Sequence, residues 1–131
     1  MTGVDTNVLV RYLLQDDGPQ ARLANRFFDE LVASGDRCAI GVVVLCELVW
    51  VLRGAYGVDR KAVVTTIDRL LSVGQIELID RDIIVAALAR YRRGPGDFAD
   101  YVISESNRHA GCAATVTFDK KLQREPAFQL L

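Results

Sequence analysis

The sequence predicts an α/β fold of three layers, in which a central, mainly parallel sheet is flanked by helices. Short apolar segments that suit strands alternate with longer segments whose apolar residues recur at helical spacing. The chain has 131 residues, of which 50% are hydrophobic. It contains no repeat or low-complexity stretch. This length and composition predict a single domain, residues 1–131, with its own core.

Six segments combine helical spacing of apolar residues with signals that start or stop a helix. Pro19 is placed to open the second segment, Asp59 and Asp97 are placed to cap the fourth and the sixth, and the sequence GPG ends the fifth. The predicted helices cover residues 7–14, 20–34, 43–55, 59–71, 82–93 and 98–109, and a further short helix is expected after Asp119.

Short apolar segments between these helices predict the strands. The first strand ends at Val4 and is short, because only the sequence MTGV precedes Asp5. The other predicted strands cover residues 37–41, 75–79, 113–118 and 128–131. Because helices separate consecutive strands, the sheet should be mainly parallel, and right-handed crossovers should bring the carboxyl ends of its strands to one edge.

Composition and charge narrow the classes of function. The formal net charge is −1, with 16 basic and 17 acidic residues, so any binding of nucleic acid must depend on a local patch. The N-terminal sequence lacks the features of a secretion signal, and no apolar run approaches the roughly 20 residues of a membrane span. We expect a soluble, cytoplasmic protein without a membrane partner.

The cysteines and the single histidine argue against a zinc site. Cys38, Cys46 and Cys112 form an odd set without a CxxC pair, and all three lie among apolar residues. They are expected to be buried free thiols in a reducing compartment. His109 is expected on the apolar side of its helix, which also leaves a Ser-His-Asp type of nucleophile set without its base.

Two aspartates are expected at the carboxyl edge of the predicted sheet. Asp5 follows the first strand and Asp119 follows the strand over residues 113–118. Open parallel sheets bind ligands outside this edge, so the two side chains are candidates for one site. Simple helix capping explains either residue equally well, since Asp is a preferred N-cap.

Two further acids lie on predicted helices. Glu47 is the only charge in VVVLCELVWVL, and a carboxylate buried there would need a cation or a hydrogen-bond network. The alternative is that Glu47 lies on a thin exposed stripe. Asp100 shares a helical stripe with Ser104 and Asn107, although its place in the first helical turn also suits the helix dipole without any further function.

A group of four carboxylates points to chemistry with a divalent cation. Like charges a few ångströms apart oppose ionisation, and a cation removes that conflict. Mg²⁺ and Mn²⁺ prefer oxygen ligands, lower the pKa of a bound water and screen an approaching phosphate. Hydrolysis of a phosphodiester requires these contributions.

Four motifs occur in an order and at a spacing that resemble one known family. VDTNVL, ELVWVL, GDFADYVI and VTFDKKL together resemble the PIN-domain ribonucleases, and most closely the VapC toxins of type II toxin–antitoxin pairs. The resemblance covers nearly the whole chain. It implies a central parallel sheet, a Mg²⁺ or Mn²⁺ site and endoribonuclease activity on RNA. It also implies a homodimer and neutralisation by a small VapB-type antitoxin protein.

The resemblance also assigns roles to particular residues. It implies that Asp5 and Asp100 are the main metal ligands, and that Glu47 and Asp119 bind a second metal or act through water. Polar residues that would support the acids are Thr6, Asn7 and Thr117. Their roles as ordinary turn and cap residues explain them about equally well. Lys120 and Lys121 directly follow Asp119 and are candidates for contacts with the substrate.

Two alternatives to a nuclease remain open. A receiver-like signalling domain has a similar length and alternation of strands and helices, and Asp80 would be its phosphoacceptor. That class needs two adjacent acids after the first strand, where this chain has Asp5 alone, and it leaves Glu47 unexplained. A catalytically inactive PIN-fold binding module is the second alternative, and the intact set of four acids argues against it.

Overall fold

The computed structural model describes residues 1–131, and the chain divides into two compact units, Met1–Ile79 and Asp80–Leu131. Each unit is described by itself. Helices predominate in both units, and every strand pairs in parallel with its neighbour. The architecture is therefore of the α/β class that the sequence predicts.

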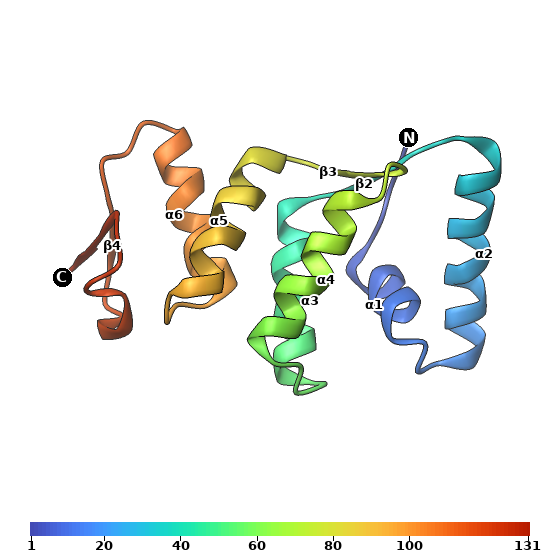
Figure 1. Ribbon diagram of the computed structural model, residues 1–131, viewed down its shortest axis with the longest axis horizontal. Coiled ribbons are helices and arrows are strands. Elements are labelled where there is room, and N and C mark those ends of the chain that lie inside the picture. The colour runs from blue at the N-terminus through green and yellow to red at the C-terminus, as the bar shows by residue number, and fades with distance from the viewer. The chain divides into compact units, whose positions relative to one another are not determined.

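The first unit contains a parallel three-stranded sheet and four helices (Figure 1). The strands β1 (Thr2–Gly3), β2 (Cys38–Ile40) and β3 (Ile76–Leu78) lie in the order β1-β2-β3. The helices are α1 (Thr6–Leu14), α2 (Gly18–Ser34), α3 (Val42–Gly54) and α4 (Arg60–Ser72). Helix α1 contacts both α2 and α3, whereas α4 contacts α3 and β3. The N-termini of α1 and α3 lie at the same edge of the sheet, because each helix follows one of two adjacent parallel strands.

The second unit contains two helices that pack against each other and a parallel pair of strands. The helices are α5 (Arg81–Arg93) and α6 (Phe98–His109), and the strands are β4 (Thr115–Thr117) and β5 (Phe128–Leu130). A single 3₁₀ turn, η1 (Lys120–Leu122), lies between the strands. Helix α6 contacts β4, and η1 contacts β5.

Local signals explain where several helices begin and end. The Asp17 side chain accepts a hydrogen bond from Gln20 N at 2.9 Å, and Asp59 accepts one from Ala62 N at 2.8 Å. Both bonds satisfy backbone donors that the first helical turn leaves unpaired. Helix α2 has Pro19 in its first turn and ends at Gly35, whose φ of 72° is a left-handed conformation that glycine adopts without strain.

Each unit has its own apolar core. In the first unit, fully buried side chains come from β2 and from helices α1, α3 and α4, and α2 adds nearly buried ones such as Phe28 and Leu31; the fully buried ones include Leu9, Cys38, Ile40, Leu45, Leu48, Val63 and Ile67. The second unit buries large rings together with aliphatic side chains; these include Ile84, Tyr91, Phe98, Tyr101 and Leu122. None of the helices combines the length and the apolar character that crossing a bilayer requires.

The predicted elements are all present, and no boundary differs by more than two residues from its prediction. The main difference is in the sheet. Its strands form a three-stranded sheet in the first unit and a separate pair in the second, and both are parallel as expected. The first strand is only two residues long, because Asp5 begins the helical region almost at once.

The predicted environments of three side chains are wrong. All three cysteines are free, but only Cys38 is buried, while Cys46 is half-buried and Cys112 is exposed. Cys112 lies in the turn after α6, where the chain leaves the core. His109 is also exposed, because it is the last residue of α6. Burial raises the pKa of the Cys38 and Cys46 thiols, so both are poor nucleophiles near neutral pH.

Candidate functional site

Asp5 stands at the carboxyl edge of the three-stranded sheet, as predicted. Val4 N donates a hydrogen bond to Ala39 O at 3.0 Å, so pairing between the two chain segments continues up to the residue before Asp5. Asp5 then occupies the N-cap position of α1, but its side chain makes no capping hydrogen bond. The exposed carboxylate also has no ion pair, so it is not committed to holding the helix.

The residues after Asp5 provide polar groups next to it. The Thr6 hydroxyl is buried and has no hydrogen-bond partner, which is an unusual state for a buried polar atom. Asn7 is exposed, and it lines a cavity between α1 and α2 together with Asp5 and Arg11. A water molecule or a cation in this region would satisfy the Thr6 oxygen.

Glu47 is exposed, which corrects the prediction of a buried carboxylate. Helix α3 buries one face through Leu45, Leu48, Val49 and Leu52. Glu47 lies on the opposite face with Val43 and Trp50, whose side chains are 71% and 78% exposed. Because its helix is apolar on nearly every side, the sequence did not show which side faces the core. Glu47 has no ion pair within the structure.

Asp100 serves as part of the start of α6. Its Oδ2 accepts a hydrogen bond from Asp97 N at 2.8 Å, which is the reciprocal bond of a capping box. Asp100 lies in the first helical turn as predicted, and its capping bond is an additional structural role, although one carboxylate oxygen remains available for another ligand. The other members of its predicted stripe have partners elsewhere: Ser104 Oγ accepts from Arg90 Nη1 at 2.8 Å, and Asn107 Nδ2 donates to Thr115 Oγ1 at 2.9 Å.

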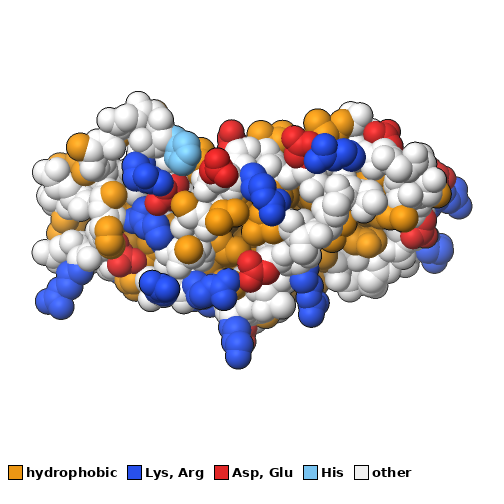
Figure 2. Space-filling view, turned by 45° about the horizontal axis from the view of Figure 1, so that its top comes forward, with side chains coloured by type: hydrophobic (Ala, Val, Ile, Leu, Met, Phe, Trp, Pro, Cys, Tyr) orange, Lys and Arg blue, Asp and Glu red, His pale blue; other side chains and the backbone are white.

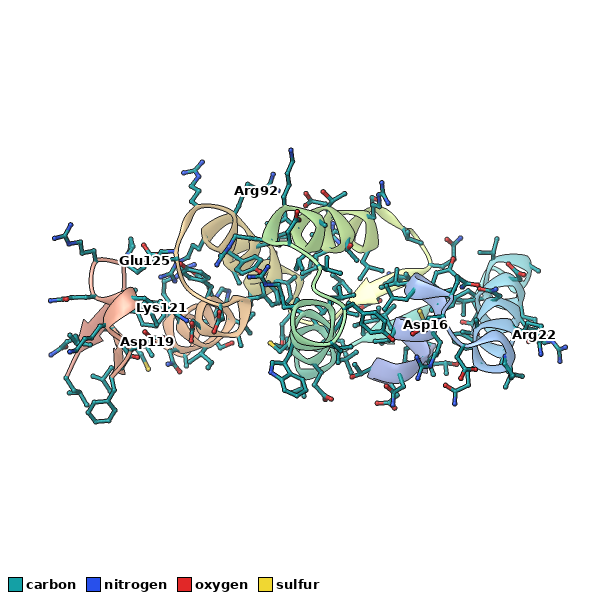
Figure 3. All side chains as sticks on the ribbon, turned by 90° about the horizontal axis from the view of Figure 1, so that it is seen from below. Asp16, Arg22, Arg92, Asp119, Lys121 and Glu125 are labelled. Atoms are coloured by element: carbon teal, nitrogen blue, oxygen red, sulfur yellow. The ribbon has the colours of Figure 1, made fainter.

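Asp119 caps the short turn η1, and its contacts are made largely by one residue. Oδ1 accepts a hydrogen bond from Lys121 N at 3.1 Å, and Oδ2 lies 3.4 Å from Lys121 Nζ. Figure 3 shows these two labelled side chains next to each other. Thr117 contributes through its hydroxyl, which accepts a hydrogen bond from Asp119 N at 3.0 Å. Thr117 thus orients the backbone of Asp119 and does not contact its carboxylate.

The two lysines after Asp119 differ in their surroundings. Lys121 Nζ also lies 3.3 Å from Asp97 Oδ2, whereas Lys120 is exposed and has no ion pair. Partial burial opposes the charge on Lys121, but the hydrogen bond and charge of Asp97, together with the charge of Asp119, outweigh that effect and raise its pKa. The sequence identified Asp97 only as a helix cap; its position three residues before Asp100 gave no sign of this pairing.

The donors in these positions suit a hard divalent cation. All four predicted acids offer carboxylate oxygens, and Asp5 and Glu47 carry no counter-ion of their own. Two of the acids belong to the first unit and two to the second. Neither unit taken alone brings together three or more side chains able to hold a metal ion. On the face drawn in Figure 2, basic and acidic side chains are interspersed, which agrees with the net charge of −1.

Comparisons with known proteins add independent evidence. The profile of the PIN domain matches residues 4–127, a span that contains all four predicted acids. A protein of Aquifex aeolicus (strain VF5), named as a VapC ribonuclease, is 23% identical over 121 residues. That alignment covers 92% of this chain and 89% of the relative. The likeness therefore extends over nearly the full length of both proteins.

Proposed function

The chain belongs to the PIN-domain family and is of the VapC type, and from this premise we propose that it is a metal-dependent endoribonuclease that hydrolyses RNA phosphodiester bonds. The observation that carries the proposal is the family match over residues 4–127 with all four acids present. The unpaired carboxylates of Asp5 and Glu47 and the unsatisfied Thr6 hydroxyl support it.

In this proposal each acid has a role. Asp5 and Asp100 would hold Mg²⁺ or Mn²⁺, and Glu47 and Asp119 would hold a second ion or orient water. When bound, such an ion lowers the pKa of a water ligand and stabilises negative charge on the phosphate oxygens. Thr6 and Asn7 would orient the Asp5 carboxylate from the adjacent turn, and Thr117 would hold the backbone of Asp119.

Basic residues would contact the RNA backbone. Lys120 is exposed and free of ion pairs, so its ammonium is available to a phosphate oxygen. The proposed acids are negatively charged, so a divalent ion would be needed to offset their charge before the phosphates of RNA approach them.

The biological setting follows from the same family. We propose that the protein is the toxin of a toxin–antitoxin pair, that a VapB-type antitoxin neutralises it, that it forms a homodimer and that it acts in the cytoplasm. The PIN match leaves the receiver-like alternative without support, and a catalytically inactive PIN-fold module is separated from a nuclease by the experiment below.

Substitution of Asp5 tests the proposal directly. Asp5→Asn should reduce cleavage of a mixed RNA pool in the presence of Mg²⁺ by more than about a hundredfold, since residues that only support metal ligands already contribute about 10–100-fold. The fold should be unaffected, because the Asp5 carboxylate makes no capping bond and Asn is an equally good N-cap. Circular dichroism provides the check on folding.

Two results would contradict the proposal. Cleavage by the wild-type protein that continues in EDTA would exclude the metal-dependent mechanism. Absence of cleavage by freshly purified wild-type protein with either Mg²⁺ or Mn²⁺, across structured and unstructured RNA, would favour the inactive binding module.

A further inference from the structure

Lys121 occupies both oxygens of the Asp119 carboxylate. Its backbone N–H donates to Oδ1 at 3.1 Å, and its ammonium lies 3.4 Å from Oδ2. Each oxygen of this carboxylate therefore already has one partner from the same residue. A cation that binds directly through Oδ2 meets the positive charge of the ammonium at the same oxygen and is repelled by it.

Asp97 keeps the ammonium in this position. Lys121 Nζ lies 3.3 Å from Asp97 Oδ2, so the lysine bridges two aspartates that are 22 positions apart in the sequence. The Lys121 side chain is 40% exposed, and the Asp97 and Asp119 side chains are 75% and 40% exposed. Solvent reaches the whole group, so the ammonium can leave without breaking a buried contact.

We propose that Lys121 is the resident counter-ion of Asp119, and that a divalent cation binding through Asp119 displaces its ammonium from Oδ2. This inference rests on the proposed metal-dependent function. It adds that Asp119 is neutralised before metal binds, whereas Asp5 and Glu47 have no counter-ion of their own. Metal affinity is therefore set partly by the protein's own lysine.

Lysine variants and Mn²⁺ titration test the inference without any measurement of activity. Lys121→Met removes the charge and keeps the length of the side chain, and Lys121→Gln repeats the removal with a polar group. Both should bind Mn²⁺ about two- to fivefold more tightly than the wild type, the size of effect expected for one solvent-exposed ion pair. Lys121→Arg keeps the charge and should restore wild-type affinity. Free Mn²⁺ is measured by electron paramagnetic resonance in the absence of RNA.

Lys120→Met is the matched control, because Lys120 is adjacent in the sequence, equally charged and without an ion pair. It should change Mn²⁺ affinity much less than Lys121→Met does. Equal effects of the two variants, no effect, or weaker binding by Lys121→Met would each overturn the inference; the last result would mean that Lys121 positions Asp119 for the metal.

The outcomes also separate the inference from the proposed function. If the wild type binds Mn²⁺ and the Lys121 variants bind it no more tightly, the counter-ion role is wrong while the metal-dependent function stands. If neither the wild type nor any variant binds Mn²⁺, both are wrong. Circular dichroism confirms that each variant is folded before titration.

Discussion

Glu105 is a buried carboxylate that belongs to neither the predicted acids nor the proposed chemistry. Glu105 is 5% exposed. Its Oε1 lies 3.1 Å from Arg90 Nη1, and its Oε2 lies 2.8 Å from Arg108 Nη2. The Arg90 guanidinium also donates to Ser104 and to the Pro126 carbonyl, and it lies over the ring of Tyr101 at 5.1 Å from the centroid. These contacts tie α5, α6 and the segment before β5 together. A buried charge with this many partners stabilises the unit only while all of them are present.

Replacing Glu105 by Gln should destabilise the protein in a pH-dependent way. Burial acts to raise the pKa of Glu105, but Arg108 and Arg90 outweigh burial and hold it below the ordinary value of 4.5. Because the folded-state pKa is lowered, the stabilisation is complete above that ordinary value and is lost as the pH falls through the folded-state pKa. Glu105→Gln should lower the free energy of unfolding by about 1–3 kcal/mol at pH 7 and by progressively less below the ordinary pKa, as measured by urea denaturation.

Glu77→Gln provides the comparison for Glu105→Gln. Glu77 pairs with Arg37 at 3.0 Å, but the two side chains are 41% and 55% exposed. An exposed pair of this kind contributes at most about 1 kcal/mol and is screened by salt. A loss of stability for Glu105→Gln that is no larger than for Glu77→Gln, or that does not diminish in acid, would show that the buried pair is not a source of net stability.

At the scale of helices, Asp100 has two roles: it helps to cap the start of α6, and it is a proposed metal ligand. Its Oδ2 accepts the Asp97 N–H, and an Asn side chain at this position would still offer an oxygen acceptor. Asp100→Asn should therefore preserve stability, whereas Asp100→Ala should lower the free energy of unfolding by about 0.5–1.5 kcal/mol. Both should lose Mg²⁺-dependent cleavage, because both remove the charge. Urea denaturation and an RNA cleavage assay separate the two roles.

Asp59→Ala is the control for Asp100→Ala, because it removes a helix cap without changing a proposed metal ligand. Asp59 caps α4 through its bond with Ala62 N and is not among the proposed acids. Its replacement by Ala should cost about 1 kcal/mol of stability and leave cleavage intact. If Asp100→Asn retained cleavage, Asp100 would be a helix cap and not a metal ligand. If it lost as much stability as Asp100→Ala, the amide oxygen would not replace the carboxylate in the capping bond.

The positions of the helices could be predicted because their signals act on neighbouring residues. Pro19 lies in the first turn of α2, and Asp59 accepts a hydrogen bond from Ala62 N in the first turn of α4. Both act within about one helical turn, so their effect does not depend on tertiary structure. The strand after His109 was also placed correctly, since its apolar residues are flanked by turn sequence. Helix α6 was predicted from Phe98 to His109 and is observed over the same residues.

Side-chain environments were less predictable because they depend on contacts between distant segments. Glu47 is surrounded by apolar residues along α3, yet packing decides which face is buried, and Glu47 is exposed. Cys112 lies among small apolar residues but in an exposed turn. The pairing of Lys121 with Asp97 joins residues that are 24 positions apart, and no local pattern indicates it.

At the scale of the whole molecule, the four proposed metal ligands are shared equally between the two compact units. Asp5 and Glu47 belong to Met1–Ile79, and Asp100 and Asp119 belong to Asp80–Leu131. Neither unit alone groups three metal-binding side chains, and two carboxylates make a weak site for Mg²⁺ or Mn²⁺. The proposed function gives a metal-binding role to Asp5 in the first unit and to Asp100 in the second.

Thermal unfolding with and without Mn²⁺ tests the roles proposed for Asp5 and Asp100. An ion that binds only the folded protein stabilises it by about 2.7 kcal/mol at a hundredfold excess over its Kd, which should raise the Tm of the wild type by several degrees. Asp5→Asn and Asp100→Asn should each abolish most of this increase, because each removes one charged ligand from the same ion. Glu77→Gln should keep it, since Glu77 pairs with Arg37 and takes no part in the proposed site. If either Asn variant kept the full increase while the other lost it, the ion would be held within one unit, and the four acids would not act together.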